Sequence, residues 1–402
     1  MGKSSFYIVI VMCFAEILTM LGVFIFPALM PEFIAIWGLS NTEAGWIAGI
    51  LLASYAISVP VLVSLTDRID ARTIYISGVT LTAISLFGFA YLASGFWSAF
   101  IFRILAGIGL ASSYMPGLRI LVDRYNGIKH ARAIAFYTAS FSLGTGVSFY
   151  FSGEVNNVLG WASTHTIAGL SAVISAFLVF FLTSKKVPQK ADIDIGLLDF
   201  RPVIRNREAM GYILAYGIHS WELFGTRAWL VTFLVYCLFV QNISQTWLVP
   251  TTVVSISAIF AVFTSIIGNE IADRYGRRRV IMVFLLSSGV FAFLIGFSAG
   301  LPYWFIVSIV ILYGGLIQLD SASLTAGSLQ AAEKGRRGAT LGLHALIGFG
   351  GGAVGPLVVG LVLDFSGGGA TTISWGLAFA SMGLVAFLGP IVLWKYRGHS
   401  KI

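Results

Sequence analysis

Several titratable side chains interrupt long apolar segments of this chain. They are Glu16, Arg103, His219, Glu222, Arg227, Asp320 and His344. An ionised side chain at the centre of a bilayer costs at least about 2.5 kcal/mol, so it normally lines a hydrated cavity or meets a partner. We therefore expect the carboxylates and arginines of this set to surround one shared chamber, which binds a solute, a proton or both.

The segment 217–229 carries three of these groups. His219 and Glu222 lie three residues apart and would share one face of a helix. A carboxylate beside an imidazole in a low-dielectric environment can hold and release a proton, so we predict a proton-binding pair. Arg227 lies roughly 140° around the helix from Glu222 and is expected to meet Asp320 or an anionic substrate. The alternative is that Glu222 and Arg227 form static ion pairs between helices.

The remaining groups indicate a second pair and a cavity wall. Glu16 and Arg103 are predicted to pair with each other, either in a binding site or only to fix helix packing. Asp320 lies in a polar run that is typical of a hydrated wall, with Gln318, Ser321, Ser323 and Thr325. His344 and the aromatic residues, Tyr137 among them, are expected to be packing residues.

Long apolar blocks must position these groups. Hydrophobic residues make up 57% of the chain and charged residues 10%, whereas soluble domains carry about 25% charged residues. Twelve blocks approach the roughly 20 residues that a spanning helix needs. They lie near residues 6–30, 43–66, 73–95, 97–122, 131–154, 161–183, 209–237, 249–271, 279–299, 302–327, 338–363 and 372–394. The sequence therefore predicts an all-α integral membrane protein.

The basic residues are distributed asymmetrically around these blocks. Of the 25 Lys and Arg residues, all but Arg103 and Arg227 lie in alternate loops or at the termini, while the opposite loops hold Glu32, Glu43 and Asp364. This pattern predicts a multi-pass protein of the inner (plasma) membrane with both termini in the cytoplasm. The net charge of +8 is then a sign of topology, and a nucleic-acid partner is not expected.

The chain divides into two related halves. The polar stretch 184–208 predicts a cytoplasmic linker between a six-helix bundle over 1–183 and a second one over 209–402. An offset of 206 residues relates Asp67 to Asp273 and Glu16 to Glu222. An internal repeat with a site at its interface is typical of transporters.

Two loops and one helix carry a family resemblance. Residues 64–73 read SLTDRIDART and residues 270–280 read EIADRYGRRRV, and both resemble the loop motif of the major facilitator superfamily. The second copy is the closer one, through Asp273, Arg274, Gly276, Arg277 and Arg278. The first copy has Asp70 and Ala71 where Gly and Arg are usual. Residues 103–109, RILAGIG, are similar to the family's motif in helix four.

The resemblance implies two pseudo-symmetric six-helix bundles that rock about a central site. In that family the first helix of each three-helix unit lines the cavity, and all five charged candidates lie on those helices. The resemblance also implies a cytoplasmic gate formed by the two loop motifs, including Arg68. Asp67 would face the start of helix eleven, and Arg72 would lie near Asp123. The alternative is that these residues only set topology.

No phosphate-binding loop or metal-ligand cluster is visible, so we expect no cofactor, no metal and no enzyme. The energy must then come from a gradient, and the buried carboxylates favour protons as the coupling ion. We predict a monomeric, proton-coupled secondary transporter for a small polar solute, with a lean toward an anion. One alternative is proton-antiport efflux of amphipathic compounds, although helix five lacks the G-P motif of the family's drug antiporters. Another is a non-transporting receptor or scaffold.

Overall fold

The computed structural model describes residues 3–125, 130–186 and 199–397, and within these ranges every regular element is a helix. This confirms the predicted all-α class. Three of the 25 basic residues, Lys129, Lys190 and Lys401, lie outside the described ranges, as does the middle of the predicted linker.

The first bundle, as we call it, comprises α1 to α7. Its helices are α1 (Lys3–Met20), α2 (Ile25–Ala28), α3 (Met30–Trp37), α4 (Asn41–Leu65), α5 (Ala71–Leu92), α6 (Phe96–Arg124) and α7 (His130–Leu182). The second bundle follows the short helix α8 (Arg201–Arg205). Its helices are α9 (Arg207–Val240), α10 (Pro250–Tyr275), α11 (Arg277–Gly296), α12 (Tyr303–Gln318), α13 (Ser321–Gln330), α14 (Arg337–Phe365), α15 (Thr372–Ala386) and α16 (Leu388–Lys395).

Ten described segments are long and apolar enough to span a membrane. One of them, in α7, bends at Gly160, where φ is 79°, a value that favours glycine. That segment therefore supplies two crossings, and the shorter apolar helix Phe6–Met20 supplies one more. The structure thus accounts for the twelve predicted helices.

Three of the predicted helices are interrupted, and one of the breaks is short, at Phe387 between α15 and α16. The first apolar block was expected to be one helix over 6–30, but it breaks after Met20 and restarts as α2. Pro27 has no backbone N–H, so the carbonyl of Val23 loses its intrahelical donor. The block over 302–327 breaks between α12 and α13, which places Asp320 directly before the first residue of α13.

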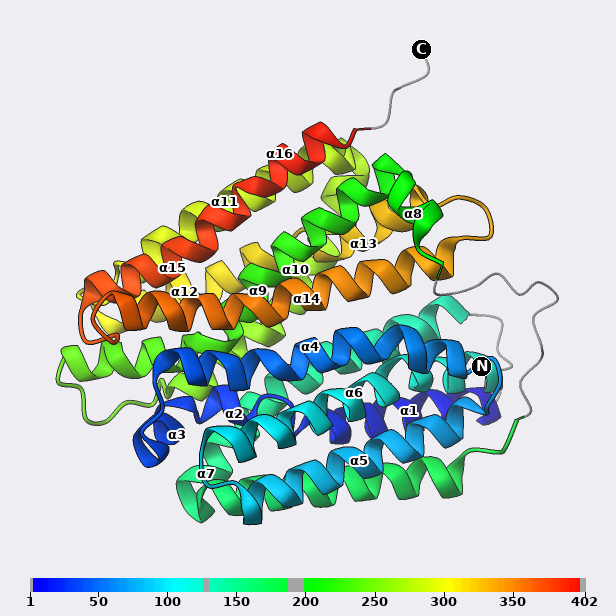
Figure 1. Cartoon of the computed structure of the whole chain (residues 1–402), viewed down its shortest axis with the longest axis horizontal. Helices are drawn as coiled ribbons and strands as arrows, with labels where there is room; N and C mark the ends of the chain where they lie inside the picture. Colours follow the sequence, from blue (N-terminus) through cyan, green and yellow to red (C-terminus); the bar gives the residue numbers. More distant parts are fainter. Residues whose placement is uncertain (1–2, 126–129, 187–198, 398–402) are drawn as a thin grey trace.

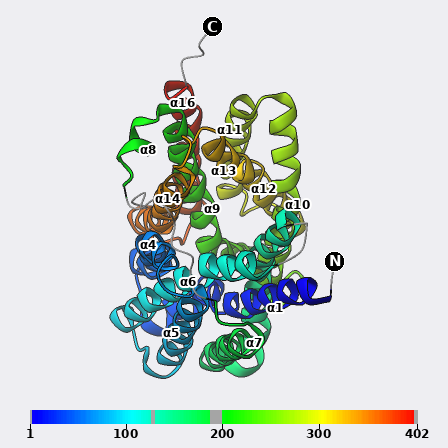
Figure 2. The ribbon, with the colours of Figure 1, turned by 90° about the vertical axis from the view of Figure 1, so that its right-hand side faces the viewer.

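The two bundles meet mainly along α4 with α14 and α7 with α10, and to a smaller extent where α2 and α3 contact α9. Figure 1 shows α4 and α14 running side by side, and Figure 2 shows the same neighbours after a 90° turn. Glycine permits the close approach: a Cβ on Gly49 of α4 would lie 2.2 Å from the carbonyl oxygen of Ala353 in α14. Small residues serve this purpose where helices pack in lipid.

The two ends of the molecule differ in what they contain. The start of α1, the end of α16 and α8 all lie toward the right in Figure 1, and we call this the linker end. The short helix α3 and the last turn of α14 lie at the opposite end, which we call the far end.

Candidate functional site

A small cavity lies between the two bundles. The first bundle lines it with Val23, Phe24, Pro27, Ala48, Leu51, Leu52 and Arg103, and the second with Phe224, Arg227, Ala228 and Pro356. The two arginines are the charged residues of this lining, and all the others are apolar. Such a lining suits a molecule with an anionic group and an apolar part.

Arg103 is held by backbone carbonyls. Its Nη1 donates to the oxygen of Val23 over 2.9 Å, and its Nε donates to the oxygen of Ile47 over 3.3 Å. The Val23 carbonyl is the one that Pro27 leaves without an intrahelical donor. Arg103 therefore supplies the hydrogen-bond donor that is missing at the break between α1 and α2, and its side chain is buried there.

Arg227 has a different environment. Its guanidinium lies 5.8 Å from the ring centre of Phe24 and 5.6 Å from that of Phe224, so aromatic faces from both bundles flank it. Among the described residues no carboxylate lies within ion-pair distance of it and no hydrogen bond satisfies it. A guanidinium in this state keeps its donors free for a bound anion.

The predicted pairings are wrong in three places. Glu16 and Arg103 do not pair, because Arg103 bonds to carbonyls and Glu16 to a phenol. Arg227 does not meet Asp320, which lies against His219. His219 therefore pairs with Asp320 rather than with Glu222. The five charged residues were expected to line one chamber, but of these five only Arg103 and Arg227 line the cavity between the bundles.

Glu16 lies inside the first bundle and is fully buried. Its Oε2 lies 2.9 Å from the hydroxyl of Tyr137 on α7. The other oxygen, Oε1, is buried without a hydrogen-bond partner in the described structure. Tyr137 was expected to be a packing residue, and the structure shows that it also contacts this carboxyl.

Glu222, at the equivalent position of the second bundle, meets a hydroxyl at each oxygen. The hydroxyl of Ser288 lies 2.9 Å from Oε2 and 3.2 Å from the backbone oxygen of Leu285, and the hydroxyl of Tyr313 donates to Oε1 over 3.0 Å. These donors come from α11 and α12. Glu222 therefore ties three helices of its own bundle together.

A third polar cluster joins α9, α13 and α14. His219 Nδ1 lies 2.7 Å from Asp320 Oδ1, with both side chains buried, although the contact is not aligned as a hydrogen bond. The ring of Tyr216 stacks on His344 with centroids 3.9 Å apart and on His219 at 5.6 Å. His344 Nε2 lies 3.2 Å from the hydroxyl of Thr325. His344 is thus packed, as expected, and it also belongs to a polar cluster.

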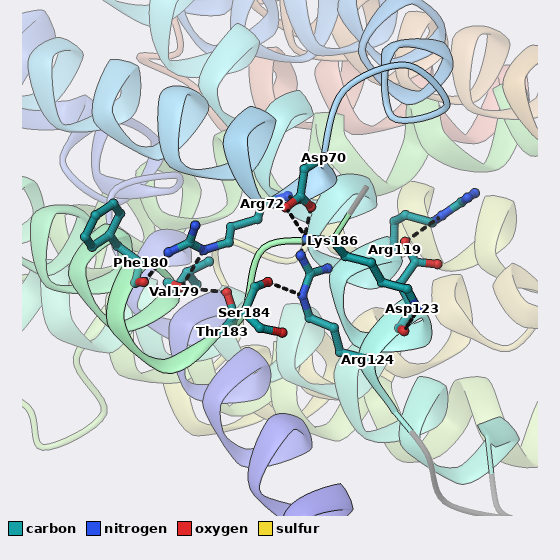
Figure 3. Close-up of polar contacts among 10 residues, drawn as sticks. All are labelled: Asp70, Arg72, Arg119, Asp123, Arg124, Val179, Phe180, Thr183, Ser184 and Lys186. Carbon is teal, nitrogen blue, oxygen red and sulfur yellow. Dashed lines mark hydrogen bonds and ion pairs between the residues drawn. The ribbon is translucent and has the colours of Figure 1, made fainter. Parts of the chain in front are cut away.

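The first loop motif is bound within its own bundle, as Figure 3 shows. Asp70 accepts hydrogen bonds from Arg124 over 2.8 Å and from the backbone N–H of Lys186 over 2.9 Å. Burial alone would raise the pKa of Asp70, but these hydrogen bonds, with one from the N–H of Arg72, outweigh it. The pKa of Asp70 is therefore held below its ordinary value.

The predicted contacts of Arg72 and Asp67 are also corrected. Arg72 does not lie near Asp123 but donates to the carbonyls of Val179 and Phe180, with its guanidinium 4.9 Å from the Phe180 ring centre. A cation at the end of α7 is stabilised by the exposed carbonyls there. Asp67 lies 3.6 Å from Arg119 of α6, and no side chain caps the start of α14 with a hydrogen bond in the described structure. Arg119 in turn pairs with Asp123 at 3.0 Å.

The second loop motif is likewise internal to its bundle. Asp273 pairs with Arg277 over 3.0 Å and is largely exposed. Arg278 donates to the carbonyl of Leu393, and Arg274 lies over the ring of Tyr275. Gly276 has a φ of 97°, which explains why this copy keeps the glycine. Asp70 occupies the equivalent position of the first copy and caps α5 instead.

The side-chain hydrogen bonds that join the bundles, within the described ranges, are all at the far end. Asp364 of α14 accepts from the backbone N–H of Asn41 over 3.0 Å and from that of Thr42 over 2.8 Å. These are the first two N–H groups of α4, which favour a negative charge. Asp364 thus makes, at the far end, the kind of contact that was expected of Asp67 at the linker end.

Sequence reasoning missed the hydroxyl partners of the carboxylates. Tyr137, Tyr313 and Ser288 come from helices far away in the chain from Glu16 or Glu222. The repeat offset does not reveal them, since the counterparts of the two tyrosines are Leu343 and Gly107. These partners could be recognised only as hydroxyl side chains that face a buried carboxyl on a neighbouring helix. Recognising them requires the rotation of each helix about its axis, which the sequence alone does not give.

Comparison with known proteins gives a consistent picture along the chain. A family model described as Major Facilitator Superfamily matches residues 12–252 and 245–401. Human protein spinster homolog 1 is 24% identical over 47% of this chain, and that alignment spans only 36% of the human protein. The class B tetracycline resistance protein of Escherichia coli is 24% identical, with 85% of this chain and 84% of that protein aligned. Sphingosine-1-phosphate transporter SPNS2 of Xenopus tropicalis is 23% identical over 88% of this chain and 72% of its own length.

Solved structures show the same fold. The nucleoside transporter NupG has a TM-score of 0.79 at 15% identity, with 98% of this chain and 99% of that chain covered. A bacterial homolog of human spinster, in an inward-facing and unoccupied conformation, has a TM-score of 0.77 at 15% identity, with both chains fully covered.

Proposed function

The chain belongs to the major facilitator superfamily, and from this premise we propose that it is a proton-coupled secondary transporter of the inner membrane, which binds the anionic group of its solute at Arg227. The observation that carries this proposal is the free guanidinium of Arg227 in the cavity between the bundles. An unpartnered cation within the membrane-spanning part of a protein is costly in free energy unless a solute or water binds to it. A site between two bundles is also the position that alternating access requires.

The cavity lining narrows the class of solute. Apart from Arg103 and Arg227 it is apolar, with Phe24 and Phe224 beside the free guanidinium. We propose a small solute with one anionic group and an apolar portion. A relative named for transport of sphingosine-1-phosphate, which combines these two features, supports this choice.

Protons are the proposed coupling ion. Glu16, Glu222 and the His219–Asp320 pair are buried groups that can bind a proton, and they lie inside the bundles rather than at the cavity. A proton site separate from the solute site lets the two ligands bias the same motion without competing.

The orientation follows from the basic loops. Arg124, Lys186 and Arg278 lie at the linker end, so this end is proposed to face the cytoplasm. The bundles are joined at the far end by Asp364. We therefore propose that the structure is closed toward the outside. We also propose that a single monomer is the transport unit.

A second candidate is efflux of amphipathic compounds in exchange for protons. The apolar lining and the relative named for tetracycline resistance favour it. The two candidates differ in the direction of solute flux against a proton gradient.

Transport into proteoliposomes with an imposed pH gradient tests the proposal. The probes are matched pairs of anionic and neutral solutes, namely benzoate with benzamide and uridine monophosphate with uridine. We expect flux of an anionic member that depends on the gradient, is lost in Glu222→Gln, and is absent in empty vesicles. Flux of neutral members alone would overturn the anion site. Tight binding without flux would indicate the receptor alternative.

A further inference from the structure

The hydroxyl of Tyr137 has two hydrogen-bond acceptors within reach, one of them on Glu16. The hydroxyl of Tyr137 lies 2.9 Å from Glu16 Oε2 and 3.0 Å from the backbone oxygen of Tyr114 on α6. A phenol has one proton to donate, and a backbone carbonyl can only accept. Tyr137 therefore cannot donate to both neighbours at once.

The direction of the phenol's hydrogen bond gives two arrangements. If Tyr137 donates to the Tyr114 carbonyl, Glu16 must be protonated and donate to the phenol oxygen. If Tyr137 donates to Glu16, the carboxyl is an anion or carries its proton on Oε1, and the carbonyl loses the phenol. The second arrangement then leaves a charged or a donating Oε1 buried without a partner, which costs more than the neutral carbonyl oxygen that the first arrangement leaves there.

The charges around Glu16 favour the first arrangement. The titratable groups that interact with it are Cys13 on its own helix and Tyr55, Tyr75, Tyr114 and Tyr137 on four other helices. Among them is no arginine, lysine or histidine that would compensate an anion. The described salt bridges do not include Glu16 either.

Gly117 provides the space for this arrangement. A Cβ at Gly117 would lie 2.2 Å from the Tyr137 hydroxyl oxygen. Any other residue there would push the phenol away from the α6 backbone and from Glu16. The contact therefore depends on three helices at once: α1 supplies the carboxyl, α6 the carbonyl and the space, and α7 the phenol.

We propose that Tyr137 is the positioning residue for a proton on Glu16, with the proton donated from Glu16 to the Tyr137 hydroxyl and the phenol proton donated to the Tyr114 carbonyl. Gly117 is the residue that allows the phenol to reach both. Because α7 packs against α10 of the other bundle, release of this proton changes how an interface helix is held. The inference deepens the coupling part of the proposed function and rests on it for its biological meaning.

Infrared spectroscopy of the full-length protein in lipid nanodiscs tests the inference without any solute. A protonated carboxyl gives a C=O stretch that an ionised one lacks. We expect Glu16→Gln to remove one such band at neutral pH. Tyr137→Phe should keep the band and shift it to higher frequency, because the carboxyl loses its partner, and Gly117→Ala should shift it in the same direction.

Tyr114→Phe is the matched control, since it removes a neighbouring phenol but keeps the backbone carbonyl, and it should leave the band in place. If Glu16→Gln removes no band, or if Tyr114→Phe shifts it as Tyr137→Phe does, the inference is overturned. If Tyr137→Phe does not fold, Gly117→Ala decides alone. If the protein transports no anion, the proposed function is wrong, but the infrared result still decides whether Tyr137 positions a proton on Glu16.

Discussion

Glu16 and Glu222 occupy equivalent positions of the two bundles, yet their surroundings are unlike. Glu222 accepts hydrogen bonds on both oxygens, from Ser288 and Tyr313. Glu16 has one partner, Tyr137, and one bare oxygen. The repeat has therefore kept the position of a carboxyl but not its environment. The second bundle holds its carboxyl between hydroxyls from two helices, whereas the first bundle leaves one carboxyl oxygen without a partner in the described structure.

The two arginines differ in the same way. Arg103 of the first bundle uses its donors on the carbonyls of Val23 and Ile47. Arg227 of the second bundle contacts aromatic rings and keeps its donors free. A charged side chain in the cavity wall is therefore available to a ligand only if the protein's own groups do not already occupy its hydrogen-bond donors.

The largest predicted effect separates the two arginines. Arg103→Ala should lower the free energy of unfolding by about 3 kcal/mol, because two buried carbonyls lose charged donors. Arg227→Ala should change it by less than about 1 kcal/mol, because that side chain makes no hydrogen bond in the described structure. Unfolding in mixed micelles, followed by tryptophan fluorescence, measures both. Equal losses for the two variants would show that the arginines are equivalent.

The next effect separates the carboxyls. Glu222→Gln should cost about 2 kcal/mol, since a carboxyl that meets a hydroxyl at each oxygen is replaced by an amide that can accept on one atom only. Glu16→Gln should cost less than about 1 kcal/mol, because a neutral amide resembles the protonated acid. The same unfolding assay reports both values. A larger loss for Glu16→Gln would contradict the assignment of roles.

The sequence predicted the framework of this site but not its contacts. The apolar blocks gave the helices, and the offset of 206 residues related Glu16 to Glu222. The predicted pairs failed because a partner depends on helix rotation and tilt, which spacing along one helix does not define. His219 and Glu222 share a helix face by spacing, but their partners come from α13 in one case and from α11 and α12 in the other. The break after Met20 was also missed, although Pro27 was visible.

The smallest effect concerns the two loop motifs. Asp70 is partly buried, with its pKa held below the ordinary value of 3.8 by the hydrogen bonds from Lys186, Arg124 and Arg72, which outweigh its burial. Its contribution to stability is therefore present at neutral pH and is lost as the pH falls below that value. Asp70→Asn should cost on the order of 1 kcal/mol at neutral pH and should reduce the further loss on acidification.

Asp273→Asn is the matched control for this prediction, because Asp273 is largely exposed and pairs with Arg277, the first residue of the next helix. It should change stability by about 0.3 kcal/mol or less. Thermal unfolding in detergent at neutral and acid pH compares the two variants. If acidification lowers the unfolding temperature equally in Asp70→Asn and in the unaltered protein, Asp70 does not contribute to the acid sensitivity of stability.

Arg227 is proposed to hold the anionic group of a solute between the bundles, and equilibrium binding measures this contact without any transport step. Titration calorimetry of the protein in nanodiscs would compare uridine monophosphate and benzoate with their neutral partners, uridine and benzamide. We predict that an anion binds more tightly than its neutral partner, and that Arg227→Ala weakens it about tenfold or more while leaving the neutral partner unchanged. Equal affinities for charged and neutral partners, or an anion affinity that Arg227→Ala does not change, would contradict the account.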